Sequence, residues 1–81
     1  MELIETGFKQ IESGFEHNIT FEFEGRQFTA YVVETQDETF VQECFYLVPL
    51  GNRLAIDIPK YFGSFSSDVF SFIYNNIQNG F

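Results

Sequence analysis

The residues able to do acid–base or nucleophilic chemistry are few, beginning with a single histidine and a single cysteine. Because histidine is the side chain that ordinarily exchanges protons near neutral pH, general acid–base catalysis would rest on His17. A general base also needs an orienting partner and a concave site. His17 stands in the apolar row of an alternating segment, with Glu16 on the opposite face and Glu34 expected nearby. This position favours a partly buried histidine at the end of a sheet over a catalytic one.

The cysteine, Cys44, lies between Glu43 and Phe45. A reactive thiolate needs an electropositive neighbour, and these two residues provide none. We therefore expect Cys44 to be a small core side chain. A lone cysteine forms no internal disulfide, and residues 1–5 do not resemble a signal peptide, so we expect a cytoplasmic protein.

Carboxylates gather at Glu34, Asp37 and Glu38. They lack the spaced Asp-x-Asp-x-Asp-Gly loop with its terminal glutamate, so we expect no calcium site and no other metal. The serines of the C-terminal segment suit helix caps and solvent-facing positions better than the role of a nucleophile. The chain also contains no glycine-rich phosphate loop and no basic–aromatic nucleic-acid surface. These patterns predict a non-enzymatic protein without a cofactor.

Charge is distributed unevenly along the 81 residues, whose formal net charge is −8. Residues 1–43 contain ten acidic side chains against Lys9 and Arg26, whereas residues 44–81 are balanced. An acidic protein repels nucleic acid and anionic membranes, so the expected partner is a basic protein surface. The alternative is that the acidic side chains only maintain solubility.

The elements that would position these groups are clearest at residues 15–24, where bulky and polar residues alternate strictly. A period of two predicts a half-buried strand, and Glu24-Gly25 predicts a tight turn into a second strand at 27–34. The same alternation fixes the expected pairing on each face. The apolar pairs are Phe21–Phe28, Ile19–Ala30 and His17–Val32; the polar pairs are Glu22–Gln27, Thr20–Thr29 and Asn18–Tyr31.

The first segment can be interpreted in two ways. Its apolar residues recur at helical spacing, at Ile4, Phe8, Ile11 and Phe15. This spacing predicts an amphipathic helix over residues 2–13 that Gly14 ends. The competing interpretation makes Ser13-Gly14 a hairpin turn and residues 8–12 a strand.

Strands at 39–48 and 53–58 follow, and the last segment holds the densest group of aromatic residues. Ser64 or Ser66 would cap a helix there, and Asn79-Gly80 would close it. Its apolar arc spans about 200° on a helical wheel, more than one small sheet can cover. The predicted fold is a single α+β domain of residues 1–81, in which an N-terminal and a C-terminal helix pack on a four-stranded antiparallel meander.

Two functional hypotheses follow. In the first, an acidic face binds a basic site on a partner protein, such as a nucleic-acid enzyme; its residues are Glu16, Glu22, Glu24, Glu34, Asp37, Glu38 and Tyr31. In size and charge the chain is similar to phage and mobile-element inhibitors of nucleic-acid enzymes, including anti-CRISPR proteins, and to the immunity proteins of nuclease toxins. In the second, the chain is a homodimer or an assembly subunit with an aromatic interface: Phe62, Phe65, Phe72 and Tyr74.

Overall fold

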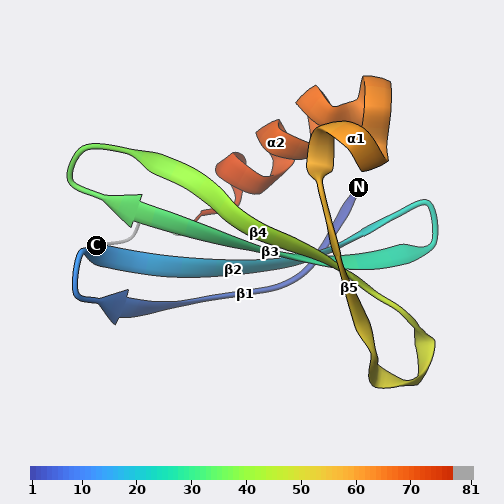
Figure 1. Cartoon of the computed structure of the whole chain (residues 1–81), viewed down its shortest axis with the longest axis horizontal. Helices are drawn as coiled ribbons and strands as arrows, with labels where there is room; N and C mark the ends of the chain where they lie inside the picture. The colour runs from blue at the N-terminus through green and yellow to red at the C-terminus, as the bar shows by residue number, and fades with distance from the viewer. Residues whose placement is uncertain (78–81) are drawn as a thin grey trace.

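Five antiparallel strands precede the helices in the computed structural model, which describes residues 1–77 (Figure 1). The strands are β1 (Glu2–Ile11), β2 (Gly14–Phe23), β3 (Arg26–Thr35), β4 (Thr39–Leu47) and β5 (Arg53–Ile56). They pair in sequence order, so the sheet is a meander with β1 and β5 at its edges. The helices are α1 (Ile58–Phe62) and α2 (Ser66–Asn75), with short 3-10 turns η1 (Pro49–Gly51) and η2 (Gly63–Phe65). The predicted α+β class is confirmed, although the sheet has five strands rather than four.

The β2–β3 hairpin has the register that alternation predicts, and all six expected pairs are present. Glu24 and Gly25 both have positive φ, 51° and 78°, which suits a two-residue turn that follows the twist of the strands. Phe21 and Phe28 face each other with ring centroids 5.5 Å apart, and neither has exposed surface. This cross-strand pair forms the centre of the core.

The predicted N-terminal helix is wrong, because residues 2–11 form β1. A turn at Glu12-Ser13 places Ile11 opposite Gly14, and the backbone of β1 then bonds to β2 along its length. A helix of this length would be marginal in water and further weakened by Gly7, whereas the ladder satisfies the same backbone groups against a preformed strand. The competing hairpin interpretation is nearer to the structure, with the turn one residue earlier and the strand longer.

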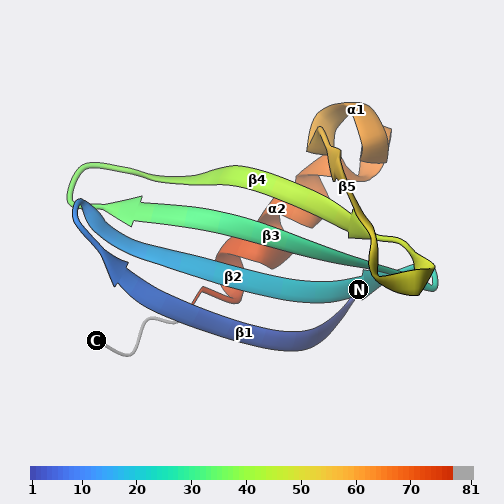
Figure 2. The same ribbon diagram turned by 60° about the horizontal axis from the view of Figure 1, so that its bottom comes forward.

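Both helices lie on one face of the sheet (Figure 1, Figure 2). The buried cluster joins sheet to helices and comprises Ile19, Phe21, Phe28, Ala30, Val32, Cys44, Ile58, Phe62, Val69, Ile73 and Ile77. The ring of Phe62 lies 5.0 Å from that of Phe28, and the ring of Phe72 lies 5.6 Å from that of Phe21. The sheet and α1 therefore cover much of the apolar arc of α2.

The boundaries near the C-terminus differ from those predicted. β5 ends at Ile56 instead of residue 58, because Pro59 occupies the first turn of α1, where its missing N–H costs nothing. Neither predicted serine caps α2, whose N-cap is Phe65 without a side-chain bond. The Ser66 hydroxyl instead donates to the Gly63 carbonyl at 2.6 Å. The predicted closure at Asn79-Gly80 lies outside the described residues.

Candidate functional site

His17 is buried against the helix-covered side of the sheet with Glu34 beside it. The Nε2 atom of His17 lies 2.9 Å from Oε1 of Glu34, and the histidine is 1% exposed. Glu34 thus provides the orienting carboxylate that a general base needs, but a substrate cannot reach so deeply buried a ring. His17 was expected to be partly buried, and it is buried almost completely. Glu34 belongs to this internal pair and not to an outward acidic face, which corrects its predicted place among the partner-binding residues.

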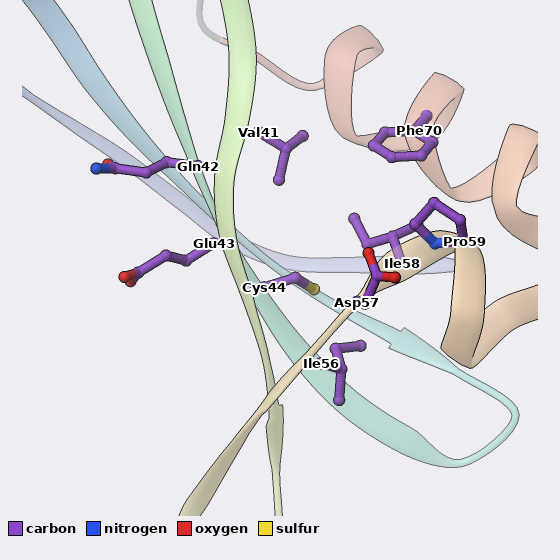
Figure 3. Close-up of a pocket in the computed structure, with 9 residues that line it drawn as sticks. All are labelled: Val41, Gln42, Glu43, Cys44, Ile56, Asp57, Ile58, Pro59 and Phe70. Atoms are coloured by element: carbon purple, nitrogen blue, oxygen red, sulfur yellow. The ribbon is translucent and has the colours of Figure 1, made fainter.

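Cys44 lines a pocket of about 110 Å³ between β4, β5 and the helices (Figure 3). Figure 3 shows Gln42 and Glu43 pointing away from the other lining side chains, which are apolar apart from the Cys44 thiol and the Asp57 carboxylate. Burial raises the pKa of the Cys44 thiol to about 12, and a backbone hydrogen bond from Phe45 opposes this shift only in part. The thiol therefore stays protonated at neutral pH, as expected for a core side chain.

Native Cys44 should resist thiol reagents. Between an ordinary pKa of 9.0 and one of about 12, the thiolate fraction at mildly alkaline pH falls about a thousandfold. We expect an aromatic disulfide reagent to label the denatured protein rapidly and the native protein at least about a hundredfold more slowly. Absorbance of the released thiol with and without urea measures both rates, and equal rates would contradict the burial of Cys44.

The opposite side of the sheet carries no helix among the described residues, and we call it the helix-free face. Alternation along the paired strands places on it Glu2, Glu5, Gly7, Lys9, Ile11, Gly14, Glu16, Asn18, Thr20, Glu22, Gln27, Thr29, Tyr31, Val33, Thr35, Phe40, Glu43, Phe45, Leu47, Arg53 and Ala55. Thr20 and Thr29 hydrogen-bond to each other at 2.9 Å near its centre. This surface is the broadest candidate for binding a partner.

The β1–β2 half of the helix-free face is acidic. Glu2 lies directly opposite Glu22 in the register, and Glu5 lies opposite Thr20. Four carboxylates in this half, those of residues 2, 5, 16 and 22, accompany one ammonium, that of Lys9. The Lys9 ammonium lies 3.6 Å from Glu16, so three carboxylates are left without an ion pair among the described residues.

The β3–β5 half is aromatic instead. The Arg53 guanidinium lies over the Phe45 ring at 4.5 Å and donates a hydrogen bond of 3.2 Å to the Tyr31 hydroxyl. The rings of Tyr31 and Phe45 meet edge-on with centroids 6.0 Å apart. This cluster covers part of the apolar surface of β4 that has no helix above it.

The predicted acidic face is thus only partly assembled. Glu16, Glu22 and Tyr31 share the helix-free face, but Glu24 lies in the β2–β3 turn, and Asp37 with Glu38 follows β3 at its other end. Figure 1 shows these turns at opposite ends of the sheet. The ten residues of β3 between them span about 30 Å.

Sequence reasoning also missed Glu2 and Glu5, because both were assigned to a helix. It likewise missed the role of Arg53. Apolar alternation gives no signal in this segment, because Phe8 and Ile11 lie on opposite faces of β1. The Ser13-Gly14 turn of the competing hairpin interpretation was the available signal, since pairing back from it places Glu5 on this face.

The four aromatic residues predicted for self-association do not form one surface. Phe62 is 6% exposed, and Phe72 packs against Phe21, whereas Phe65 and Tyr74 are 48% and 38% exposed. The latter two contact different neighbours: the Phe65 ring lies 5.6 Å from that of Phe23, whereas the Tyr74 ring stacks on that of Phe70 at 6.4 Å. An aromatic interface on the C-terminal helix stays a prediction, supported now by these two side chains alone.

Within residues 1–77, no cluster of three or more His, Cys, Asp or Glu side chains is arranged to hold a metal ion. In the same part of the chain, no helix has the length and apolar character needed to cross a membrane. Comparison of the chain with protein-family models, with curated proteins and with solved structures gives no match. We therefore infer function from the positions of the side chains.

Proposed function

We propose that the protein is a non-enzymatic binding module of the cytosol that uses the acidic half of its helix-free face to bind a basic protein surface. The observation that carries this proposal is the alignment of Glu2 with Glu22 across β1 and β2. Like charges directly opposite each other destabilise a sheet, so folding does not favour this arrangement. Binding to cations on a partner would relieve the repulsion.

The spacing of these carboxylates supports a partner that normally binds nucleic acid. Side chains on one face recur about every 6.8 Å along a strand and about every 4.8 Å between strands. A lattice of carboxylates at such distances can compete with phosphates for arginine and lysine side chains. The Arg53, Tyr31 and Phe45 cluster adjoins this lattice with the aromatic and guanidinium groups that are enriched in protein interfaces. An inhibitor of a nucleic-acid enzyme, such as phages encode, would have these properties.

A matched pair of triple variants tests the proposal. The partner is first isolated by affinity purification from the source cell at low and moderate salt and identified by mass spectrometry. Its association rate is then measured with a variant reversing Glu2, Glu16 and Glu22 to lysine. Attraction between an acidic and a basic surface speeds their encounter, so we expect the association rate of the triple variant to be at least about tenfold lower than that of the wild type. The association rate of the wild type should fall as the salt concentration rises.

The control reverses Glu24, Asp37 and Glu38, which changes the net charge equally but at the two ends of the sheet. We expect its association rate to stay within about threefold of the wild-type value. Equal effects of the two triples would show that total charge matters and the face does not. No effect of either would leave the acidic residues a role in solubility only.

A further inference from the structure

The outer edge of β1 has the length and the charge pattern to pair with a second copy of itself. β1 pairs with β2 along one side, and no other described strand lies along its other side (Figure 2). An edge strand of ten residues is a template for another strand unless charge, proline or a bulge blocks it. β1 contains no proline, and its one irregularity lies between Leu3 and Glu5, near its beginning. Residues 5–11 are therefore a regular edge.

Backbone direction limits how two such edges can meet. Ile11 and Gly14 close the two-residue turn as a hydrogen-bonded pair, and antiparallel bonding alternates from there. Glu5 and Lys9 therefore direct their N–H and C=O groups toward β2, whereas Thr6 and Gln10 direct theirs outward. In a symmetric antiparallel pair, the outward-directed residues of one copy must lie opposite outward-directed residues of the other. With both helix-free faces on the same side, this condition is met only when the two-fold axis passes through a residue position, where that residue lies opposite its own copy.

We propose that the β1 strands of two copies pair antiparallel about Gly7, joining the two sheets into one of ten strands. This register places Lys9 of each copy opposite Glu5 of the other on the helix-free face, and Phe8 opposite Thr6 on the helix side. A two-fold axis at Lys9 would set two ammonium groups against each other. An axis at Phe8 would give Glu5 and Lys9 no charged partner in the other copy, and Lys9 would keep only Glu16 of its own chain. Of these three positions, only Gly7 pairs opposite charges, twice by symmetry.

Other features of β1 agree with this register. Phe8 and Leu3 are 49% and 41% exposed, large values for apolar side chains on the helix side of the sheet. In the Gly7 register the two Phe8 rings become diagonal neighbours about 7–8 Å apart, a distance that aromatic side chains bridge. The irregularity beside Ile4 lies outside the stretch from residue 5 to residue 9 that the two copies share.

The dimer goes beyond the proposed binding of a basic partner and does not depend on it. It would bring the two acidic halves of the helix-free face together at the centre of one continuous surface. Because each copy contributes its four carboxylates and one ammonium there, the dimer doubles the acidic lattice.

Charge-reversal variants of Glu5 and Lys9 test the proposed dimer. Glu5→Lys places two lysines opposite each other in the dimer, and Lys9→Glu places two glutamates there. We expect each single variant to raise the dimer dissociation constant at least about tenfold, because two attractive pairs become repulsive. The equimolar mixture of the two variants should dimerise as tightly as the wild type or more tightly, since both cross-strand pairs are then of opposite charge. Sedimentation equilibrium over micromolar to millimolar concentrations measures all four samples.

Glu12→Lys, in the turn beyond β1, is the matched control for Glu5→Lys and should leave the dissociation constant unchanged. Far-UV circular dichroism and thermal melts of each variant confirm that the fold is intact before the comparison. A wild type that stays monomeric throughout the concentration range overturns the proposal. So does a mixture of Glu5→Lys and Lys9→Glu that dimerises no better than either variant alone.

Discussion

Replacing Phe21 or Phe28 by alanine is expected to lower the free energy of unfolding by about 3–5 kcal/mol. Both side chains are fully buried, and each contacts a helical aromatic ring as well as its cross-strand partner. Truncation would leave a cavity between sheet and helices that neighbouring rings cannot fill without leaving their rotamers. A domain of this length has about 4–12 kcal/mol of stability in total, so either variant should be largely unfolded or close to it. Urea melts followed by circular dichroism measure the change.

Glu22→Ala is the control, because residue 22 follows Phe21 in β2 but faces the other side of the sheet. Its removal takes away one of two glutamates that face each other across β1 and β2, and we expect a change within about 0.5 kcal/mol. If Glu22→Ala destabilises the protein as much as Phe21→Ala, the assignment of the two faces is wrong. Double replacement of Phe21 and Phe28 should cost less than the sum of the singles, since the rings contact each other.

The success of the hairpin prediction and the failure of the helix prediction have the same physical origin. In β2, ten residues alternate without interruption, so the period of two identifies the strand and the faces together. In β1, the irregularity between Leu3 and Glu5 breaks the alternation and shifts the first apolar residues out of phase. The remaining apolar positions happen to match helical spacing. A bulge depends on the partner strand, so the sequence of one segment does not reveal it.

For the candidate site, the sequence could predict only that acidic residues are concentrated in the first half of the chain. The excess of carboxylates in residues 1–43 is visible in the sequence, but which of them share a face depends on pairing. Glu34 faces the helix side because the register sets it opposite Phe15, and there its carboxylate meets His17, seventeen residues away in the sequence. Arg53 and Tyr31 meet across three strands and 22 residues. Contacts between residues so far apart in the sequence depend on the register of the strands. That register can be predicted for the whole sheet only when β1 and β5 are assigned correctly.

Gly14→Ala should be the most damaging small substitution outside the core. Gly14 begins β2, has a φ of 155°, and lies opposite both Ile11 and Thr35. A methyl group there would overlap the backbone carbonyl of Glu34, which cannot move without separating β2 from β3. We expect a loss of about 2–5 kcal/mol, combining about 1–3 kcal/mol of backbone strain with a similar cost of overpacking.

The control is Gly25→Ala in the β2–β3 turn, where φ is 78° and no other atom lies within 4 Å of the added methyl group. Only backbone strain remains there, so the expected loss is about 1–2 kcal/mol. Urea melts compare the two variants, and the imidazole resonances of His17 report whether its bond to Glu34 has changed. Separation of the strands at Gly14 should shift those resonances in Gly14→Ala but not in Gly25→Ala. Equal stability losses, with His17 unchanged in both, would mean that the close approach of Gly14 to Glu34 does not constrain the fold.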